Sequence, residues 1–585
     1  MDSEGMATRR AARVARSLAG SRLVARGAAA LPAALLAAGA ILRFVNLGGR
    51  QLFRDEAASW LLAGYPLGAM LDHARFEAYP PLYSIVLSAW IGLFGDSEAA
   101  LRSLSVLAGL ATLGVVWAWA RETLGRAPAC VALALAALSV ILIDDARDAR
   151  MYAIETAFAT ASWWLIWRLL TLEARLDRRR RTALLTAAAL AIAVAGELWT
   201  LALGLPTAGL QVIVVGLGAL AGARARLAVL DRPSPRIWTP RGLAGAVGAI
   251  PRGPGLAIVA LAIGGATFLV WLPNLLAVAG NGQPFWTGRP GPDALYQTLN
   301  RAVSTTGQWD ATVPAPFIAF GLAVMGTVGL LGIRRPQHGS EPTAASTSSQ
   351  LRWFGIALIF AASIVPVVWL YSQVRPIYDT RYMGSLAPPL CLLIAAGLTT
   401  LGRWLRSRAL PSILLIALVS MMASGAIGFV QSRSVNGDVN PAQETAAQLV
   451  TMVRPGDVVL TVDARTYFPI DYYLARAGGE KALGIELYDW YGPEQPFFYG
   501  TYLIPEARVI RPSQVDEIGW ARALPGLEPG GTIWLVTIGN GDREDIGFAP
   551  LSTDQLVERS RLLVPGSSGS GGRYGQIHQL TIPGS

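Results

Sequence analysis

The chain has 585 residues, of which 53% are hydrophobic and only 15% are charged, and its mean hydropathy is +0.42. Soluble domains rarely combine these values, so the composition argues against a soluble protein and indicates one with many membrane spans. The net charge of +10 comes mostly from short arginine clusters between apolar runs, which indicates membrane topology rather than nucleic-acid binding.

The sequence contains few residues that could bind a metal ion or form a disulfide bond. The two cysteines, Cys130 and Cys391, both lie inside apolar runs, and His73, His338 and His578 are far apart. Such spacing provides neither a disulfide framework nor a zinc site. We therefore expect the protein to work without a metal or any other bound cofactor.

The apolar runs predict a polytopic α-helical membrane protein with about eleven transmembrane helices. A basic tail, residues 1–27, precedes the first run, and no small-residue cleavage site follows that run, so we expect it to remain as the first span. Positive linkers such as 403-RWLRSR-408 stay on the cytoplasmic side, which places the N-terminus inside and the C-terminus outside the plasma membrane. The predicted spans lie near residues 28–47, 99–120, 127–143, 151–170, 183–199, 202–221, 255–276, 315–333, 353–372, 384–402 and 411–430.

The apolar segment 80-PPLYSIVLSAWIGLFG-95 does not fit this series, because it is short. If it crossed the membrane, the basic linkers 121-RETLGR-126 and 175-RLDRRRR-181 would both lie outside. We therefore expect an interfacial helix within a long external loop, residues 48–98, with Pro80 and Pro81 in its first turn. The alternative is that the segment spans the membrane and that the charge rule fails here.

The chain after the last span has a different composition. Residues 28–431 are predicted to form the membrane domain, and residues 432–585 a small α/β domain outside the membrane. Strand-like runs, 457-DVVLTVD-463 and 531-GTIWLVTIGN-540, alternate with helix-like stretches such as 441-PAQETAAQLVTMV-453, and this alternation is typical of an α/β domain.

Charged and aromatic residues gather in the predicted external loops, which are residues 48–98, 144–150, 197–202, 277–314 and 373–383. Arginine suits a phosphorylated ligand because its planar fork binds two oxygens. An ionised side chain inside a span costs about 2.5–3.5 kcal/mol, so we expect Glu197 to face a polar cavity. Aromatic belts at membrane interfaces explain many of the aromatic residues equally well. The candidate residues of one outward-facing site are Asp55, Glu56, Glu77, Tyr79, Asp148, Arg150, Tyr152, Glu197, Trp286, Arg381 and Tyr382.

Several of these segments resemble the polytopic GT-C glycosyltransferases, in particular the bacterial branch near protein O-mannosyltransferases and lipid A aminoarabinose transferases. They occur in the expected order and cover roughly residues 28–400. Tyr79 stands where members often have His or Lys, and 197-ELW-199 where a His is often found, so the acceptor stays open. The matching segments are 54-RDEA-57, 80-PPLYSIVLSAWIGLFGDSEAALRSLSVLAG-109, 147-RDARMYA-153, 285-FW-286 and 375-RPIYDTRYM-383.

The resemblance implies a membrane enzyme that transfers a sugar from a polyprenyl-phosphate-linked donor to an external acceptor in one inverting step. Asp55 would act as the general base, and Glu56 would tune or position it. Arg150 and Arg381 would hold the lipid phosphate while tyrosine hydroxyls donate hydrogen bonds to it.

Those hydroxyls would come from Tyr152 and Tyr382. Glu77 would bind sugar hydroxyls or orient the acceptor. The other substrate-binding candidates are Tyr79, Asp148, Glu197 and Trp286. The sugar stays open, and the acceptor is a lipid, a glycan or a protein; membrane lipids surround the enzyme, and no nucleic acid is expected.

A transporter or flippase for a lipid-linked glycan is the main alternative, because it also needs arginines for phosphate. It would place polar residues at mid-membrane on both sides of a pathway. Here the charges gather on the predicted external side, and the cytoplasmic loops are plain basic connectors. A structural membrane protein with an external binding domain would not need the carboxylates and arginines of the short loops.

Overall fold

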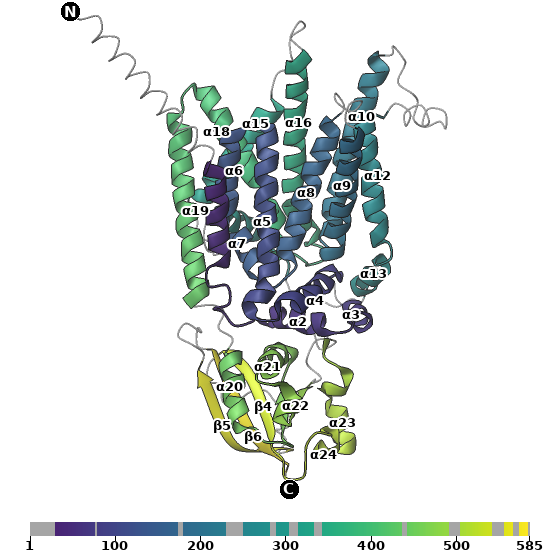
Figure 1. Cartoon of the computed structure of the whole chain (residues 1–585), viewed down its shortest axis with the longest axis vertical. Helices are drawn as coiled ribbons and strands as arrows, with labels where there is room; N and C mark the ends of the chain where they lie inside the picture. The colour runs from purple at the N-terminus through teal and green to yellow at the C-terminus, as the bar shows by residue number, and fades with distance from the viewer. Residues whose placement is uncertain are drawn as a thin grey trace, which may run out of the picture.

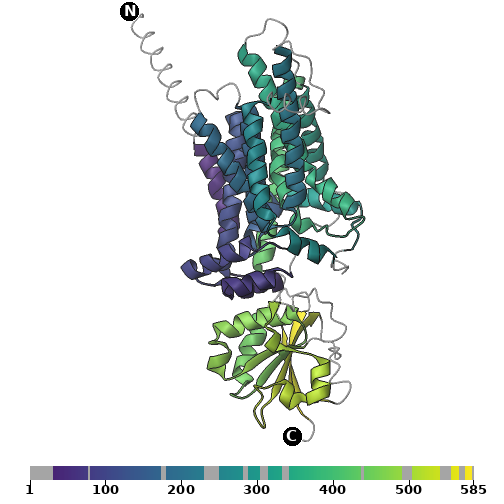
Figure 2. The ribbon, with the colours of Figure 1, turned by 90° about the vertical axis from the view of Figure 1, so that its right-hand side faces the viewer.

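The computed structural model describes residues 30–76, 79–172, 180–229, 250–280, 288–303, 314–332, 342–435, 441–490, 503–540, 555–565 and 573–582. A bundle of long helices forms one part of the molecule, and a sheet with flanking helices lies beyond one end of the bundle (Figure 1). Between the two parts lies a layer of three short helices, visible from the side in Figure 2: α2 (Arg54–Gly64), α3 (Leu67–Ala74) and α4 (Leu82–Phe94).

The bundle is built from long apolar helices with short helices at the end next to this layer. Large apolar side chains such as Ile192, Val259 and Ile416 are exposed on the sides of these helices, where lipid tails would cover them. The elements are Ala30–Phe44, α5 (Glu98–Thr123), α6 (Arg126–Leu138), α7 (Val140–Arg147), α8 (Tyr152–Thr171), α9 (Arg180–Thr200), α10 (Gly204–Val229), α12 (Arg252–Phe268), α13 (Leu272–Gly280), α14 (Asp293–Val303), α15 (Ala315–Leu331), α16 (Pro342–Ala362), α17 (Ile364–Tyr371), η2 (Thr380–Tyr382), η3 (Gly384–Leu386), α18 (Ala387–Leu405) and α19 (Ala409–Val435).

The eleven predicted spans all fall on helices, but the number eleven is not confirmed. Within the described residues, six helices are long and apolar enough to cross a membrane, or up to eight if each of two bent pairs is one span. The bent pairs are α6–α7, with an angle of 54°, and α12–α13, with 61°. The helix Ala30–Phe44 and α15 are shorter than the others, and α8 is less apolar because it carries Glu155 and Arg168.

The segment that did not fit the series of spans folds as α4, which has 13 residues. A helix of this length is about 20 Å long, shorter than the roughly 30 Å hydrocarbon core of a bilayer. In Figures 1 and 2 it lies in the layer at the end of the bundle, which agrees with the predicted interfacial helix.

The C-terminal part contains one six-stranded sheet with the order β3-β2-β1-β4-β6-β5. The strands β3, β2, β1 and β4 are parallel, and β6 and β5 are antiparallel to their neighbours. The predicted strand runs fold as β1 (Val458–Thr461) and β4 (Ile533–Asn540), and the predicted helix as α20 (Ala442–Met452). The other elements are α21 (Ala464–Arg476), α22 (Gly479–Leu483), β2 (Glu486–Trp490), η6 (Glu506–Arg508), β3 (Val509–Ile510), α23 (Pro512–Ile518), α24 (Trp520–Ala523), β5 (Val557–Pro565) and β6 (Arg573–Thr581).

The direction of the sheet follows from the position of the C-terminus. The strand β6 ends close to the C-terminus, at the end of the molecule farthest from the bundle (Figure 1). Because β4 is antiparallel to β6, the carboxyl end of β4 and of its parallel neighbours faces the bundle. The helix α21 follows β1 at this edge and packs directly below α2 (Figure 1).

The contact between α15 and α18 depends on two glycines. A Cβ atom at Gly397 would overlap the carbonyl oxygen of Leu322, and one at Gly326 would overlap that of Leu393. We expect Gly397→Ala to lower the stability of the detergent-solubilised protein by about 1–3 kcal/mol, because the backbones would have to separate. Thermal unfolding measures this change. The matched control is Gly321→Ala in α15, where a Cβ meets no atom within 4 Å. An equal loss in both variants would contradict the prediction.

Candidate active site

The layer between the bundle and the sheet begins with α2, which carries the acidic pair. Phe53 precedes the helix in an extended conformation, and its backbone N–H donates to Oε2 of Glu56 at 3.0 Å. The side chain of Glu56 therefore closes the first turn of the helix that carries Asp55, since it satisfies one of the amides left free at a helix start.

Glu56 is held by a buried ion pair with Arg102 from α5. The guanidinium donates from Nε to Oε1 and from Nη2 to Oε2, both at 2.8 Å, and each side chain is only 1% exposed. The same carboxylate accepts from the backbone N–H of Ala149 at 2.9 Å and from Arg50 at 3.3 Å. Burial opposes ionisation, but Arg102 and Arg50 outweigh it and hold the pKa of Glu56 far below its usual range.

The surroundings of Glu56 consist of hydrogen-bond donors from the protein itself. Both of its oxygens are engaged by donors of the protein, and the side chain is buried away from solvent. These contacts hold the turn that carries Asp55, and the role predicted for Glu56 in the reaction stays a prediction.

Asp55 is partly exposed and faces arginines from two other segments. Its carboxylate lies 2.7 Å from Nε of Arg54 and 3.6 Å from Nη1 of Arg381, and the side chain is 19% exposed. Burial raises the pKa of Asp55, but the charges of Arg54, Arg150 and Arg381 outweigh this effect and bring it below its usual value. The carboxylate is therefore ionised at neutral pH.

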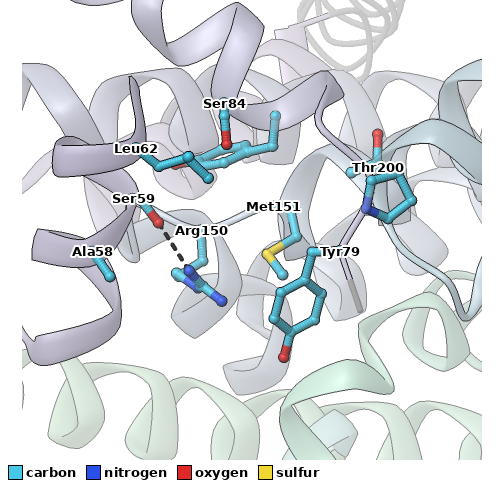
Figure 3. A pocket seen from close by; sticks show the side chains of 10 residues that line it. Ala58, Ser59, Leu62, Tyr79, Ser84, Arg150, Met151 and Thr200 are labelled. Atoms are coloured by element: carbon cyan, nitrogen blue, oxygen red, sulfur yellow. Dashed lines mark hydrogen bonds between the residues drawn. The ribbon is translucent and has the colours of Figure 1, made fainter. Parts of the chain in front are cut away.

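Arg150 lies beside the same helix, between the carboxylate and two aromatic rings. Its Nη1 donates to the backbone carbonyl of Asp55 at 3.1 Å and to Oγ of Ser59 at 2.9 Å (Figure 3). The guanidinium carbon lies 5.3 Å from the ring centroid of Tyr79 and 5.8 Å from that of Tyr152, which are distances of cation–π contacts. These contacts fix the orientation of the guanidinium.

Arg381 and Tyr382 come from η2, which Asp379 caps. A carboxylate oxygen of Asp379 accepts from the backbone N–H of Arg381 at 2.8 Å, and the other pairs with its guanidinium at 3.3 Å. The hydroxyls of Tyr382 and Tyr79 are 2.9 Å apart, and the rings of Tyr382 and Tyr152 are 5.6 Å apart. Burial and the neighbouring Tyr79 and Tyr152 raise the pKa of Tyr382, so its hydroxyl keeps its proton.

A small hollow, partly open to solvent, lies next to these residues. Tyr79 and Arg150 are two of the predicted site residues that line it, and Figure 3 shows both near Met151. Polar and apolar side chains alternate around it (Figure 3). Its lining residues are Ala58, Ser59, Leu62, Tyr79, Pro80, Tyr83, Ser84, Arg150, Met151 and Thr200.

The structure thus brings together Asp55, Tyr79, Arg150, Tyr152, Arg381 and Tyr382, whereas Glu197 lies elsewhere. Asp148 lies beside Glu56, because Nη2 of Arg50 pairs with Asp148 at 2.6 Å and with Glu56 at 3.3 Å. Glu197 is fully buried among α8, α9 and α10, where it accepts from Ser162 and Gln211, so it does not line the hollow. Glu77 and Trp286 lie outside the described residues.

The sequence analysis missed Arg50, Ser59 and Arg102. Arg102 lies at the start of a predicted span, and a charge there signals a buried acidic partner. Ser59 lies four residues after Asp55 and therefore on the same helix face. Among the described residues, no group of three or more His, Cys, Asp or Glu side chains is arranged to hold a metal ion.

Comparison with known proteins supports the same class of fold. Residues 78–219 match the family model of dolichyl-phosphate-mannose-protein mannosyltransferases, and no curated protein matches the chain. ArnT from Cupriavidus metallidurans in the apo state has a TM-score of 0.56 and 15% identity, over 95% of this chain and 98% of that chain. The same protein bound to undecaprenyl phosphate has a TM-score of 0.52 and 15% identity, over 93% and 97%.

A weaker similarity exists to the Archaeoglobus fulgidus oligosaccharyltransferase in the apo form, with a TM-score of 0.47 and 12% identity over 87% of this chain and 69% of that chain. The matches to ArnT and to the family model define the class: this chain is a multi-pass membrane protein with the fold of the GT-C glycosyltransferases. The resemblance predicted from the sequence is confirmed.

Removal of the charge of Glu56 tests whether its ion pair with Arg102 holds the first turn of α2. We expect Glu56→Gln to destabilise the protein by about 3–5 kcal/mol, because it leaves the buried guanidinium of Arg102 without its counter-charge. The control Asp72→Asn breaks the solvent-exposed pair with Arg75 and is expected to cost about 1 kcal/mol or less. Thermal unfolding in detergent compares the two. Similar stabilities of Glu56→Gln and wild type would show that the ion pair does not hold the layer.

Proposed function

We propose that the protein is a glycosyltransferase that transfers a sugar from a polyprenyl-phosphate-linked donor to an acceptor on the outer face of the plasma membrane. The observation that carries this proposal is an ionised carboxylate, Asp55, next to the two guanidinium groups of Arg150 and Arg381 at one end of a membrane bundle. The match to the mannosyltransferase family model and the likeness to ArnT, which binds undecaprenyl phosphate, support the lipid-linked donor.

Asp55 is the general base of this reaction. Its carboxylate accepts the proton of the acceptor hydroxyl while that oxygen attacks the anomeric carbon of the sugar. The bond between the anomeric carbon and the phosphate oxygen breaks in the same step, so the configuration is inverted. The electron pair of this bond remains on the lipid phosphate, which gains negative charge.

Arg150 and Arg381 stabilise that charge, because a fixed cation next to a developing anion lowers the energy of the transition state. Tyr382, whose hydroxyl keeps its proton, donates a hydrogen bond to the phosphate. In the absence of ligand, Arg381 lies 3.6 Å from Asp55. The donor phosphate draws Arg381 away from the carboxylate, which makes Asp55 a stronger base when the donor is bound.

The layer α2–α4 forms the boundary between the bundle and the C-terminal domain, so the donor lipid enters from the bilayer and the acceptor from the opposite side. In this proposal the N-terminus lies in the cytoplasm and the C-terminal domain outside, and the arginine-rich linkers support this orientation. The acceptor is a hydroxyl of a lipid, a glycan or a protein. The roles proposed for Asp55 and Arg381 require no metal.

Asp55→Asn tests the general base. The amide cannot accept the proton, so we expect kcat to fall by about 10²–10⁴-fold while the affinity for the donor changes little. The assay uses the purified protein in nanodiscs with a panel of radiolabelled polyprenyl-phosphate sugars and a cell-envelope extract as acceptor.

The matched control is Asp72→Asn, which changes an exposed carboxylate of α3 in the same layer. Wild-type turnover by a correctly inserted Asp55→Asn protein would remove the general-base role. Movement of the lipid-linked glycan across vesicles without cleavage of the sugar–phosphate bond would identify a flippase instead.

The lowered pKa of Asp55 predicts how activity depends on pH. A depressed pKa keeps the base ionised at acidic pH, so the acidic limb of kcat/KM lies below about pH 3.9, the usual value for Asp. Arg381→Gln removes one of the charges that lower this pKa, so it moves the limb to higher pH. The control Arg375→Gln changes another arginine that precedes the same turn and leaves the limb in place. An acidic limb at the same pH in Arg381→Gln and wild type would show that Arg381 does not lower the pKa of the catalytic carboxylate.

A further inference from the structure

The segment that leads into the catalytic helix is held from two sides. On the bundle side, Arg102 donates to the backbone carbonyl of Leu47 at 2.9 Å, to that of Arg50 at 2.8 Å and to that of Gln51 at 2.9 Å. The guanidinium that anchors Glu56 therefore also fixes the path of the chain immediately before α2.

On the other side, the C-terminal domain holds the same residues. The hydroxyl of Tyr473, on α21, accepts a hydrogen bond from the backbone N–H of Leu52 at 2.9 Å and donates to Glu98 at 3.3 Å. The amide side chain of Gln51 accepts from the backbone N–H of Gln443 at 2.8 Å and donates to the carboxylate of Glu444, both in α20.

These contacts lie only a few residues from the reacting carboxylate. Leu52 is fully buried, and Asp55 follows three residues later in the first turn of α2. A helix turn is stiff, so a shift of residues 51–52 moves the carboxylate with it. The helix has no side-chain cap of its own other than Glu56, so its position depends on these external partners.

We propose that the C-terminal domain positions the general base, with Tyr473 and Glu444 as the positioning residues that hold residues 51–52. The domain is thus a part of the catalytic apparatus, although none of the contacts described here places its side chains against the reacting atoms. The expected effect on kcat rests on the proposed function. The claim that the C-terminal domain holds residues 51–52 rests on the contacts alone.

Tyr473→Phe removes only the hydroxyl and keeps the buried ring. We expect kcat to fall by about 10- to 100-fold with little change in KM for the donor, because the base is misplaced while the phosphate site is intact. The matched control is Tyr472→Phe on the same helix, whose hydroxyl donates to the carbonyl of Asp96 at 2.9 Å and whose ring packs against Trp60. It makes a comparable docking contact but none with residues 51–52, so its kcat is expected to stay within about two-fold of wild type.

A swap of partners at the second contact tests the same idea by rescue. Gln51→Glu places a carboxylate against Glu444, and we expect kcat to fall by about ten-fold. In the double variant Gln51→Glu with Glu444→Gln, the amide and the carboxylate exchange places and the hydrogen bond forms again. Restoration of kcat to within about two-fold of wild type is expected, because the two changes are coupled.

Hydrogen–deuterium exchange of the full-length protein gives a readout that does not need turnover. We expect the amides of residues 52–56 to exchange about five-fold faster in Tyr473→Phe than in wild type, and at the wild-type rate in Tyr472→Phe. Unchanged exchange and unchanged kcat in Tyr473→Phe, or equal effects in both tyrosine variants, would overturn the positioning. Absence of turnover in the wild type would instead refute the proposed function, and the exchange rates would still decide whether Tyr473 holds the segment.

Discussion

The buried ion pair between Glu56 and Arg102 is the interaction on which the candidate site depends. Two charges removed from water are costly unless every lone pair and proton finds a partner, and here both side chains are almost completely engaged. The pair ties the first long helix after the layer, α5, to the turn that carries Asp55. The pair thereby fixes the conformation of the polar segment that leads into α2.

The two neighbouring carboxylates, Asp55 and Glu56, have different surroundings. The oxygens of Glu56 are bound by other groups of the protein and are buried. The side chain of Asp55, one residue earlier, is 19% exposed and pairs with Arg381, while Arg150 binds its backbone carbonyl. Side chains of adjacent residues on a helix point about 100° apart. Two neighbouring carboxylates can therefore have different surroundings: that of Glu56 binds Arg102, and that of Asp55 lies in the candidate site. The aromatic rings around Arg150 then restrict where its charge lies.

Much of the fold could be predicted from local sequence, because apolar length and the position of positive charges determine which segments can be buried in lipid. The interfacial helix α4, the helices of the bundle and the strands β1 and β4 all follow from such patterns. The residues of the site were harder to separate. Glu56 and Asp55 look alike in sequence, and only the partner Arg102, 46 positions later, distinguishes them. For Glu197, the cost of a buried charge predicted a polar cavity, and the structure places the side chains of Ser162 and Gln211 against its carboxylate.

The direction of the C-terminal sheet determines which loops of the domain can vary close to the layer of short helices. The strands β1, β2 and β4 all end at the edge that faces the bundle, so the carboxyl ends of these strands lie on the side of the layer that carries Asp55. Connections at the carboxyl ends of parallel strands tolerate replacement, because the sheet below keeps its own hydrogen bonds. Exchange of loops at this edge can therefore change the groups that the C-terminal domain presents to the layer, while the helices of the bundle and their charged anchor remain unchanged.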